Sequence, residues 1–355
     1  MKKKIISIIG ARPQFIKCAP LSGVLREQYK EILVHTGQHY DRNMSRLFFE
    51  ELNIPYPDYN LGIGSGSHGE QTGKMLQAIE KVLLKEKGNL VLCYGDTNST
   101  LAAALAGAKL NIPVAHVEAG LRSFDRSMPE ESNRIIADHV SDFLFVPSKA
   151  GMRNLKKEGL EDRAYMVGDI MYDALLENIP IAMKRSDIMD RMALKKNEYY
   201  LATVHRASNT DDRQNLAKIL QAFTELDKVV VFPAHPRTAG FIKKYSIQFD
   251  KKKVRIIPPA GYLDILKLVK YCSKVLTDSG GLQKEAFYLK RQVVVLREES
   301  EWTELVEHGV SRLAGTDRTR IIKYALTDFR SKWNFYPYGK GDTAERIMRV
   351  LKNNI

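Results

Sequence analysis

The sequence predicts an α/β protein made of two Rossmann-type domains, each with a parallel sheet covered by helices on both faces. Short apolar, β-branched runs alternate with helical segments from one end of the chain to the other, which is the pattern of parallel sheets. Polar loops follow these runs, as expected where strands end at the edge of a buried sheet. The length of 355 residues suits two domains, each with its own core.

The first domain is expected to cover residues 1–172. This domain begins with a strand, followed by the turn Gly10-Ala11-Arg12-Pro13 and a helix that ends at about Leu25. The loop QHYDRNMS then leads into a short helix that ends near Leu52. The glycine-rich segment LGIGSGSHGEQTG is either a lid or a linker. The expected strands are Lys4–Ile9, Ile32–His35, Asn89–Cys93, Ile112–Val117, Phe143–Val146 and Ala164–Val167. Further helices are expected at Glu70–Lys85, at Ser99–Lys109 and from Pro129 onward.

The second domain is expected at 173–341, with a last helix at 342–355. Residues Glu177–Glu198 are charged and lack a strand pattern, which indicates a boundary helix or linker. The expected strands are Tyr199–Val204, Val229–Pro233, Val254–Ile257, Lys274–Thr277 and Gln292–Leu296. Polar loops at one edge of each sheet predict a deep cleft between the domains, a common place for a ligand.

The composition narrows the function classes. Apolar content of 44% and charged content of 27% are those of a soluble globular protein. The net charge of +13 favours anionic partners, but it is spread along the chain, which argues against nucleic acid. Cys18, Cys93 and Cys272 lie far apart without metal-ligand spacing, so we expect no disulfide, no metal and a reducing cytoplasm. We recognise neither a signal peptide nor a membrane span.

Three acidic residues are candidate catalytic groups. Asp96 and Glu118 each follow a predicted strand, and Glu130 falls in the first turn of the helix that Pro129 begins. Each has a simpler interpretation: Asp96 as a helix N-cap, and Glu130 with Arg134 as an ordinary ion pair. Their convergence on one edge of the sheet favours proton-transfer chemistry, because neighbouring carboxylates raise one another's pKa values.

Candidate anion-binding groups lie in both domains. Arg12 and Lys17 in the first strand-to-helix connection suit a diphosphate. The alternative is two exposed cations at a helix start, but the helix dipole disfavours cations there, so a bound anion is the better explanation. The turn Ser279-Gly280-Gly281 precedes a helix whose N-terminus suits phosphate, or it is only a tight turn. Glu285, one turn further along, suits a ribose hydroxyl or is a solvated helix residue.

Two histidines, His205 and His235, follow strands of the second domain, and each is followed closely by an arginine. Two such positions favour an anion site, where a histidine donates to phosphate or acts as an acid. Metal binding is less well supported because no third ligand has suitable spacing.

These residues lie in motifs that resemble the non-hydrolysing UDP-N-acetylglucosamine 2-epimerase family. The matching segments cover nearly the whole chain in order and are GARPQFIK, HTGQHYD, GDTNSTLAAALA, HVEAGLRS, MPEESNR, HRASN, HPRT, TDSGGLQKEA and YGKGDTAERI. The resemblance implies a GT-B-like fold, a nucleotide in the cleft, a last helix that crosses back to the first domain, and a homodimer. The implied substrate is a UDP-sugar, and no metal or nicotinamide cofactor is implied.

The implied reaction interconverts UDP-GlcNAc and UDP-ManNAc, by elimination of UDP with loss of the C2 proton and re-addition to the other face. By motif, the acids Asp96, Glu118 and Glu130 would move the C2 proton, and His205 would help the diphosphate to leave. Glu285 would hold the ribose. The residues that would hold UDP are Arg12, Lys17, Arg134, His235 and Ser279–Gly281.

The sequence departs from the common family pattern at three places. Gln14 replaces a carboxylate, and Glu301-Trp302-Thr303-Glu304 replaces an arginine-containing segment. Both features, with Gln283–Ala286, are similar to a branch that epimerises UDP-2,3-diacetamido-glucuronic acid, in which Lys284 or Arg297 would contact the sugar carboxylate. The segment QHYDRNMS differs from the one that binds an activating second UDP-GlcNAc. A GT-B glycosyltransferase, a hydrolysing relative and a UDP-sugar sensor are the alternative functions.

Overall fold

The computed structural model describes residues 2–38 and 54–355. The short helix expected to end near Leu52, and most of the loop QHYDRNMS, lie outside the described residues. The chain divides into two compact units. Unit 1 comprises Met1–Glu177 and Tyr336–Ile355, and unit 2 comprises Asn178–Phe335.

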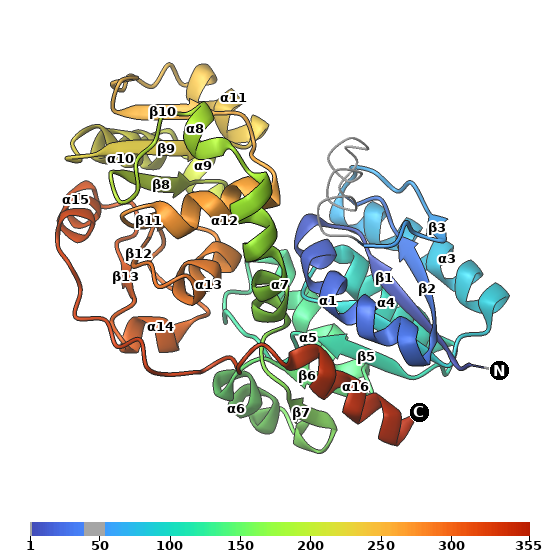
Figure 1. Ribbon diagram of the computed structural model, residues 1–355. Coiled ribbons are helices and arrows are strands. Elements are labelled where there is room, and N and C mark those ends of the chain that lie inside the picture. The colour runs from blue at the N-terminus through green and yellow to red at the C-terminus, as the bar shows by residue number, and fades with distance from the viewer. Residues whose placement is uncertain (1, 39–53) are drawn as a thin grey trace. The chain divides into compact units, whose positions relative to one another are not determined.

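Unit 1 is built on a parallel sheet with strand order β3-β2-β1-β4-β5-β6-β7 (Figure 1). The order reverses between β1 and β4, which lie side by side in register from Ile5 opposite Leu90. Such a reversal opens a crevice at the carboxyl ends of the strands. The strands are β1 (Lys4–Ile9), β2 (Lys30–His35), β3 (Tyr59–Asn60), β4 (Leu90–Tyr94), β5 (Val114–Val117), β6 (Phe143–Val146) and β7 (Ala164–Met166).

The helices of unit 1 begin with local signals that the sequence carries. The Ser67 hydroxyl caps α3 by accepting from the Glu70 N–H, and Pro129 is the first residue of α5. Alanines of α4 pack closely on the sheet within one apolar core. The helices are α1 (Arg12–Gln28), α3 (His68–Glu86), α4 (Asn98–Lys109), α5 (Pro129–Val140), α6 (Lys149–Lys157), the first half of α7 (Ile170–Arg185) and α16 (Thr343–Asn354), with a 3-10 turn at Glu161–Arg163. The residues of α7 from Asn178 onward belong to unit 2.

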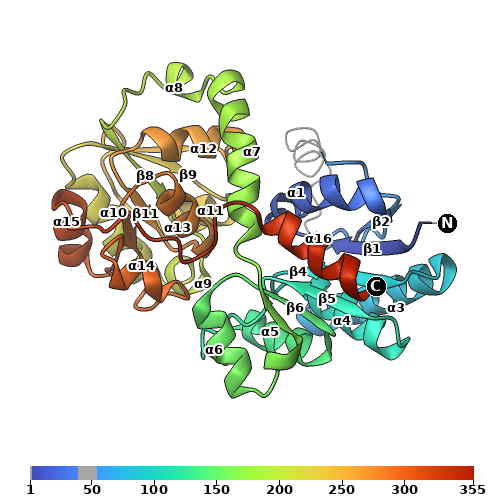
Figure 2. The ribbon, with the colours of Figure 1, turned by 60° about the horizontal axis from the view of Figure 1, so that its bottom comes forward.

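The last helix, α16, belongs to unit 1 and packs against α1 (Figures 1 and 2). Its amphipathic face buries Ile347 and Leu351. At its start, the Ala344 N–H donates to Asp173 on α7 at 2.9 Å. An apolar face and one buried hydrogen bond therefore fix the end of the chain to the first sheet unit.

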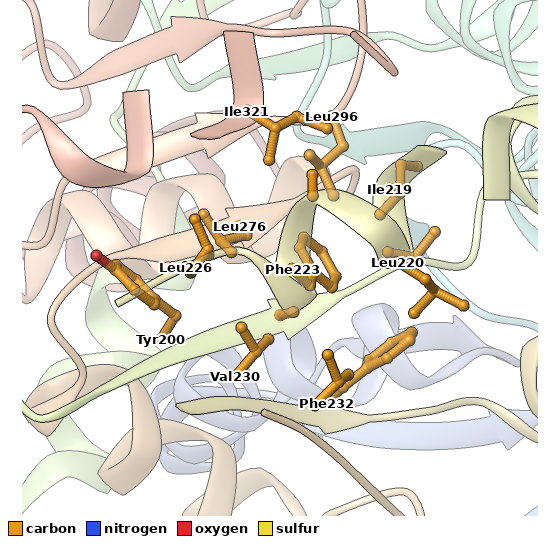
Figure 3. Packing of buried hydrophobic residues seen from close by; sticks show 14 of the residues in the cluster. Tyr200, Ile219, Leu220, Phe223, Leu226, Val230, Phe232, Leu276, Leu296 and Ile321 are labelled. Carbon is orange, nitrogen blue, oxygen red and sulfur yellow. The ribbon is translucent and has the colours of Figure 1, made fainter. Parts of the chain in front are cut away.

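Unit 2 has a second parallel sheet, with strand order β10-β9-β8-β11-β12-β13 and its reversal between β8 and β11. Its core includes Phe223, Phe232 and Leu276, which pack between the sheet and α10 (Figure 3). The strands are β8 (Tyr199–Thr203), β9 (Val229–Pro233), β10 (Val254–Ile257), β11 (Val275–Thr277), β12 (Val293–Val295) and β13 (Ser311–Leu313). The helices are α8 (Ile188–Arg191), α9 (Ala207–Thr210), α10 (Arg213–Thr224), α11 (Pro236–Lys244), α12 (Tyr262–Tyr271), α13 (Gly280–Tyr288), α14 (Thr303–Glu307) and α15 (Arg318–Leu326).

The expected parallel-sheet architecture is confirmed in both units, since every strand pair in the two sheets is parallel. Two edge strands, β3 and β13, were not expected from the sequence. Each is very short and pairs with only one neighbour, so it leaves little apolar periodicity to detect.

Candidate functional site

In unit 1, the polar ends of β1, β4 and β5 meet at one edge of the sheet. Asp96 and Glu118 follow the adjacent strands β4 and β5, which pair from Val91 opposite Val114. The backbone turns sharply there, with φ of +65° at Gly95 and +74° at Glu118. A positive φ is strained for a residue with a side chain, and such strain is often found at functional sites.

Asp96 is held by Arg134 from α5. One Asp96 oxygen, Oδ2, accepts hydrogen bonds from Arg134 Nε at 3.0 Å and from Nη2 at 2.6 Å. Asn133 also donates to the Asp96 carbonyl. The Asp96 side chain keeps a third of its surface exposed, whereas Arg134 is buried. The carboxylate is therefore anchored yet still accessible.

Glu131, the neighbour of Glu130, is the buried acid of this helix. Its carboxylate accepts from Arg134 Nη1 at 2.8 Å and from the backbone of Ser123 and Phe124 at 2.9 Å each. Burial alone would raise its pKa, but these hydrogen bonds outweigh burial and lower the pKa. Glu131 therefore stays ionised and fixes the preceding loop, while Glu130 is only half-buried on the first turn.

Glu118 and Lys17 form an ion pair in which both side chains are about nine-tenths buried. The pair lies over Gly95: a Cβ atom there would be 2.9 Å from Lys17 Nζ and 3.4 Å from Glu118 Oε2. A larger residue at position 95 would thus collide with the pair as well as strain the turn. Arg12, the first residue of α1, is half-buried.

Asp96 and Glu118 each have a cation as an ion-pair partner. Arg134 holds Asp96, and Lys17 holds Glu118.

Gln14 connects the ends of β1 and β4 at this edge of the sheet, a role that was not predicted from the sequence. Its Oε1 accepts from the N–H groups of Gly10 and Ala11, and its Nε2 donates to the Tyr94 carbonyl at 2.9 Å. The side chain is fully buried. Gln14 lies three residues after the N-cap residue Ala11, the position from which a Gln side chain reaches back to the N-cap N–H, and this spacing is the one sequence signal for its role.

In unit 2, the ends of β8 and β11 are joined by Asp278, which is fully buried. Its carboxylate accepts from the backbone N–H groups of His205 and Arg206 at 3.0 Å each and from Asn209 Nδ2 at 3.0 Å. His205 Nδ1 lies 3.2 Å from Asp278 Oδ1, and almost half of the His205 side chain is exposed. Asp278 thus presents His205 at the strand reversal, although no role for Asp278 was assigned from the sequence.

The Ser279–Gly281 turn opens α13, and Ser279 caps that helix by accepting from the Leu282 N–H. A Cβ atom at Gly281 would have no atom within 4 Å, so the helix start is uncrowded on the side of that Cβ. Because a helix N-terminus favours anions, the turn stays a candidate for phosphate. Glu285, on the next turn, is buried.

The segment after β12 lies beside the start of α13. Trp302 Nε1 donates to the Gly280 carbonyl at 3.0 Å, and the buried Lys284 ammonium lies 4.1 Å from the centre of the Trp302 ring. Arg297 donates to both oxygens of Glu301, at 2.9 and 3.1 Å. Burial would raise the pKa of Glu301, but the bonds and charge of Arg297 lower it overall.

His235 has a local structural role at the end of β9. It caps α11, its Nδ1 accepting from the Arg237 N–H at 3.2 Å, and its side chain is exposed. Because Nδ1 is an acceptor, the ring hydrogen is on Nε2, which is the position that would donate to an anion. Arg237 pairs with Asp211.

Within residues 2–38 and 54–355, no group of three or more histidine, cysteine or acidic side chains is placed to hold a metal ion. No helix in that part of the chain is long and apolar enough to cross a bilayer.

The sequence and the structure were compared with known proteins. The family described as UDP-N-acetylglucosamine 2-epimerase matches residues 24–352. A UDP-N-acetylglucosamine 2-epimerase homolog of Methanococcus maripaludis is 51% identical over 99% of both chains. The UDP-2,3-diacetamido-2,3-dideoxy-D-glucuronate 2-epimerase of Pseudomonas aeruginosa is 47% identical over 98% of this chain and 99% of its own.

The structural comparison agrees. The UDP-GlcNAc 2-epimerase of Methanocaldococcus jannaschii, in a crystal structure with UDP-GlcNAc and UDP, matches with a TM-score of 0.92. It is 45% identical, over 99% of this chain and 100% of that one. The predicted GT-B-like α/β class is confirmed, and the chain is an enzyme of the UDP-N-acetylglucosamine 2-epimerase family.

Proposed function

We propose that the protein is a non-hydrolysing epimerase that inverts C2 of a UDP-N-acetylhexosamine, converting UDP-GlcNAc to UDP-ManNAc for surface polysaccharide precursors. The reaction is an anti elimination of UDP that leaves 2-acetamidoglucal, followed by re-addition of UDP and of a proton on the other face of C2. The observation that carries the proposal is the pair of anchored carboxylates, Asp96 and Glu118, at the ends of adjacent strands.

The acids of unit 1 would move the C2 proton in both directions. Inversion needs a base on one face of C2 and an acid on the other, and Asp96, Glu118 and Glu130 supply three carboxyl groups from three elements. The ion pairs with Arg134 and Lys17 restrict the rotation of the first two, which favours reaction by holding them in place. Arg134 and Lys17, with Arg12, would share their charge with the diphosphate when substrate enters.

The groups of unit 2 would hold and release UDP. The open N-terminus of α13, at Ser279–Gly281, suits the diphosphate because its N–H groups and helix dipole favour negative charge. His205 would stabilise the departing phosphate, and His235 would donate a further hydrogen bond. Glu285 would accept from a ribose hydroxyl.

A second substrate, UDP-2,3-diacetamido-2,3-dideoxy-glucuronate, is favoured by the segment after β12. Trp302 and Lys284 form a cation–π contact beside α13. The Pseudomonas aeruginosa relative is named for that substrate. Arg297 is engaged by Glu301, so under this alternative either Lys284 or Arg297 must exchange its present partner for the sugar carboxylate.

The test is incubation of the purified protein with each nucleotide sugar, with the products separated by anion-exchange chromatography. Formation of UDP-ManNAc without accumulation of free UDP supports the proposal, and turnover of the diacetamido-uronate alone supports the alternative. Free UDP with N-acetylmannosamine would indicate a hydrolysing enzyme. Product that appears only with an added sugar acceptor would indicate a glycosyltransferase, and UDP binding without turnover would indicate a sensor.

We also propose that the protein is cytoplasmic, as its separated cysteines suggest, and that it is a homodimer, as the resemblance implies. Light scattering coupled to size-exclusion chromatography would measure the mass in solution, and the mass of a single chain would contradict dimerisation.

A further inference from the structure

Unit 1 contains a buried carboxylate, Asp138 on α5, which the proposed reaction does not use. None of its surface is exposed. One oxygen, Oδ1, lies 2.7 Å from His116 Nδ1, and the other, Oδ2, accepts from the Gly120 N–H at 3.0 Å and from Arg122 Nη1 at 2.7 Å. A buried charge is costly unless it is fully hydrogen-bonded, and Asp138 has a partner on each oxygen.

His116, in the middle of this network, is also buried, with 1% of its surface exposed. Its Nε2 lies 2.6 Å from the carbonyl oxygen of Gly95. A carbonyl only accepts, so Nε2 carries a hydrogen. Burial would raise the pKa of Asp138, but the hydrogen bonds and charges of His116 and Arg122 lower it overall. The His116 ring therefore bridges the Asp138 carboxylate, through Nδ1, and the Gly95 carbonyl, through Nε2.

Two routes of hydrogen bonds lead from Asp138, and each ends on one of the two turns that carry candidate catalytic acids. Through His116, the first route holds the carbonyl of Gly95, the residue immediately before Asp96. The second route holds the N–H of Gly120, two residues after Glu118. Gly95, Glu118 and Gly120, with φ of +65°, +74° and +80°, lie in or beside these contacts, and of the three only Glu118 has a side chain that makes a positive φ strained. Strained turns persist only where their surroundings hold them.

We propose that Asp138 is a positioning residue: through His116 and the Gly120 N–H, it sets the distance between the turns that carry Asp96 and Glu118. The catalytic meaning of this inference rests on the proposed function. The contacts themselves lie wholly within unit 1. Without Asp138, each turn relaxes separately. The Asp96 and Glu118 carboxylates then lose their fixed positions relative to each other, although each keeps its own ion pair.

The same network supplies a matched control. Arg122, the third partner of Asp138, donates to Glu158 from Nε and Nη2 at 2.8 Å each. The Glu158 side chain is a quarter exposed and pairs with Arg122 and His139, which lie outside Gly95–Asp96 and Glu118–Gly120. Glu158→Gln therefore perturbs the charge network while leaving the contacts of Asp138 with His116 and Gly120 in place.

The test compares Asp138→Asn, His116→Asn and Glu158→Gln with the wild-type protein. Amide hydrogen exchange is followed in peptides that contain Gly95-Asp96 and Glu118–Gly120, and kcat and KM for UDP-GlcNAc and UDP affinity are measured alongside. We expect Asp138→Asn to expose both turns to exchange and to lower kcat about 10²-fold, with KM and UDP affinity unchanged. His116→Asn should open only the Gly95 turn, and Glu158→Gln should open neither.

The two proposals fail separately. If the wild-type protein turns over no nucleotide sugar, the proposed function is wrong, and the exchange data still decide whether Asp138 holds the turns. Wild-type exchange and wild-type kcat in a folded Asp138→Asn variant would overturn the inference. A parallel loss of melting temperature and kcat in all three variants would do the same, because it would show general destabilisation. If Asp138→Asn does not fold, His116→Asn decides the question. Faster amide exchange at the Gly95 turn alone would support the inference, and equal exchange at both turns would overturn it.

Discussion

Asp173 makes the stability of unit 1 depend on pH in a direction that is unusual for an acid. It lies on α7, is 6% exposed, and accepts from the Ala344 N–H at the start of α16. Burial raises its pKa from 3.8 to about 6, with Asp169 adding repulsion and the bonds from Ala344 and Thr343 opposing the rise. The folded protein therefore holds this proton more tightly than the unfolded chain does.

The magnitude follows from the shift of the pKa from 3.8 to about 6. Each unit is worth about 1.4 kcal/mol, so this group contributes on the order of 3 kcal/mol. The contribution is fully present below the unfolded pKa of 3.8 and is lost as the pH rises through about 6. The Asp173→Asn variant cannot ionise, so it should lack this loss and be more stable than wild type at neutral pH.

Urea unfolding of wild type and Asp173→Asn at about pH 4 and at about pH 7 would measure the effect. Asp342→Asn is the control, because Asp342 lies at the same helix start but pairs with Arg346 at the surface, where such pairs contribute little. An equal loss of unfolding free energy with pH in wild type and Asp173→Asn would refute the reasoning.

Three further substitutions test other contacts. Gly281→Ala should leave the melting temperature unchanged, since its Cβ meets no atom within 4 Å, but should weaken UDP binding in calorimetry; unchanged affinity would argue against a phosphate at α13. Gln14→Glu should cost about 1–3 kcal/mol in urea unfolding, because a carboxylate cannot donate to the Tyr94 carbonyl; a wild-type midpoint would contradict this. Lys274→Met should lower the free energy of unfolding by a similar amount, about 1–3 kcal/mol, because the buried Lys274 ammonium donates to the Ala325 carbonyl near the end of α15. A wild-type melting temperature would show that this hydrogen bond does not stabilise the protein.

The sequence predicted most of the architecture because the central strands are fully buried. A strand covered on both faces leaves a continuous apolar run, and the polar residues just after it mark the functional edge. Asp96, Glu118, His205 and the Ser279–Gly281 turn all lie at such ends. The edge strands β3 and β13 escaped detection because so few residues pair in each.

The contacts within the site could not be predicted in the same way. Lys17 and Glu118 are far apart in the sequence and meet only because β1 and β5 both lie beside β4. Glu130 and Glu131 are adjacent, and spacing alone does not show which one turns inward toward Arg134. The role of Asp138 depends on two turns and a histidine from different elements, which no local pattern reveals.

The most direct test of the account is proton NMR of the wild-type protein with UDP-GlcNAc in deuterated water. Removal of the C2 proton by a carboxyl group, followed by return of a solvent-derived proton, predicts UDP-ManNAc that carries deuterium at C2. Epimer that retains its original C2 hydrogen, or UDP-GlcNAc that stays unchanged although UDP binds, would contradict proton transfer by Asp96, Glu118 and Glu130.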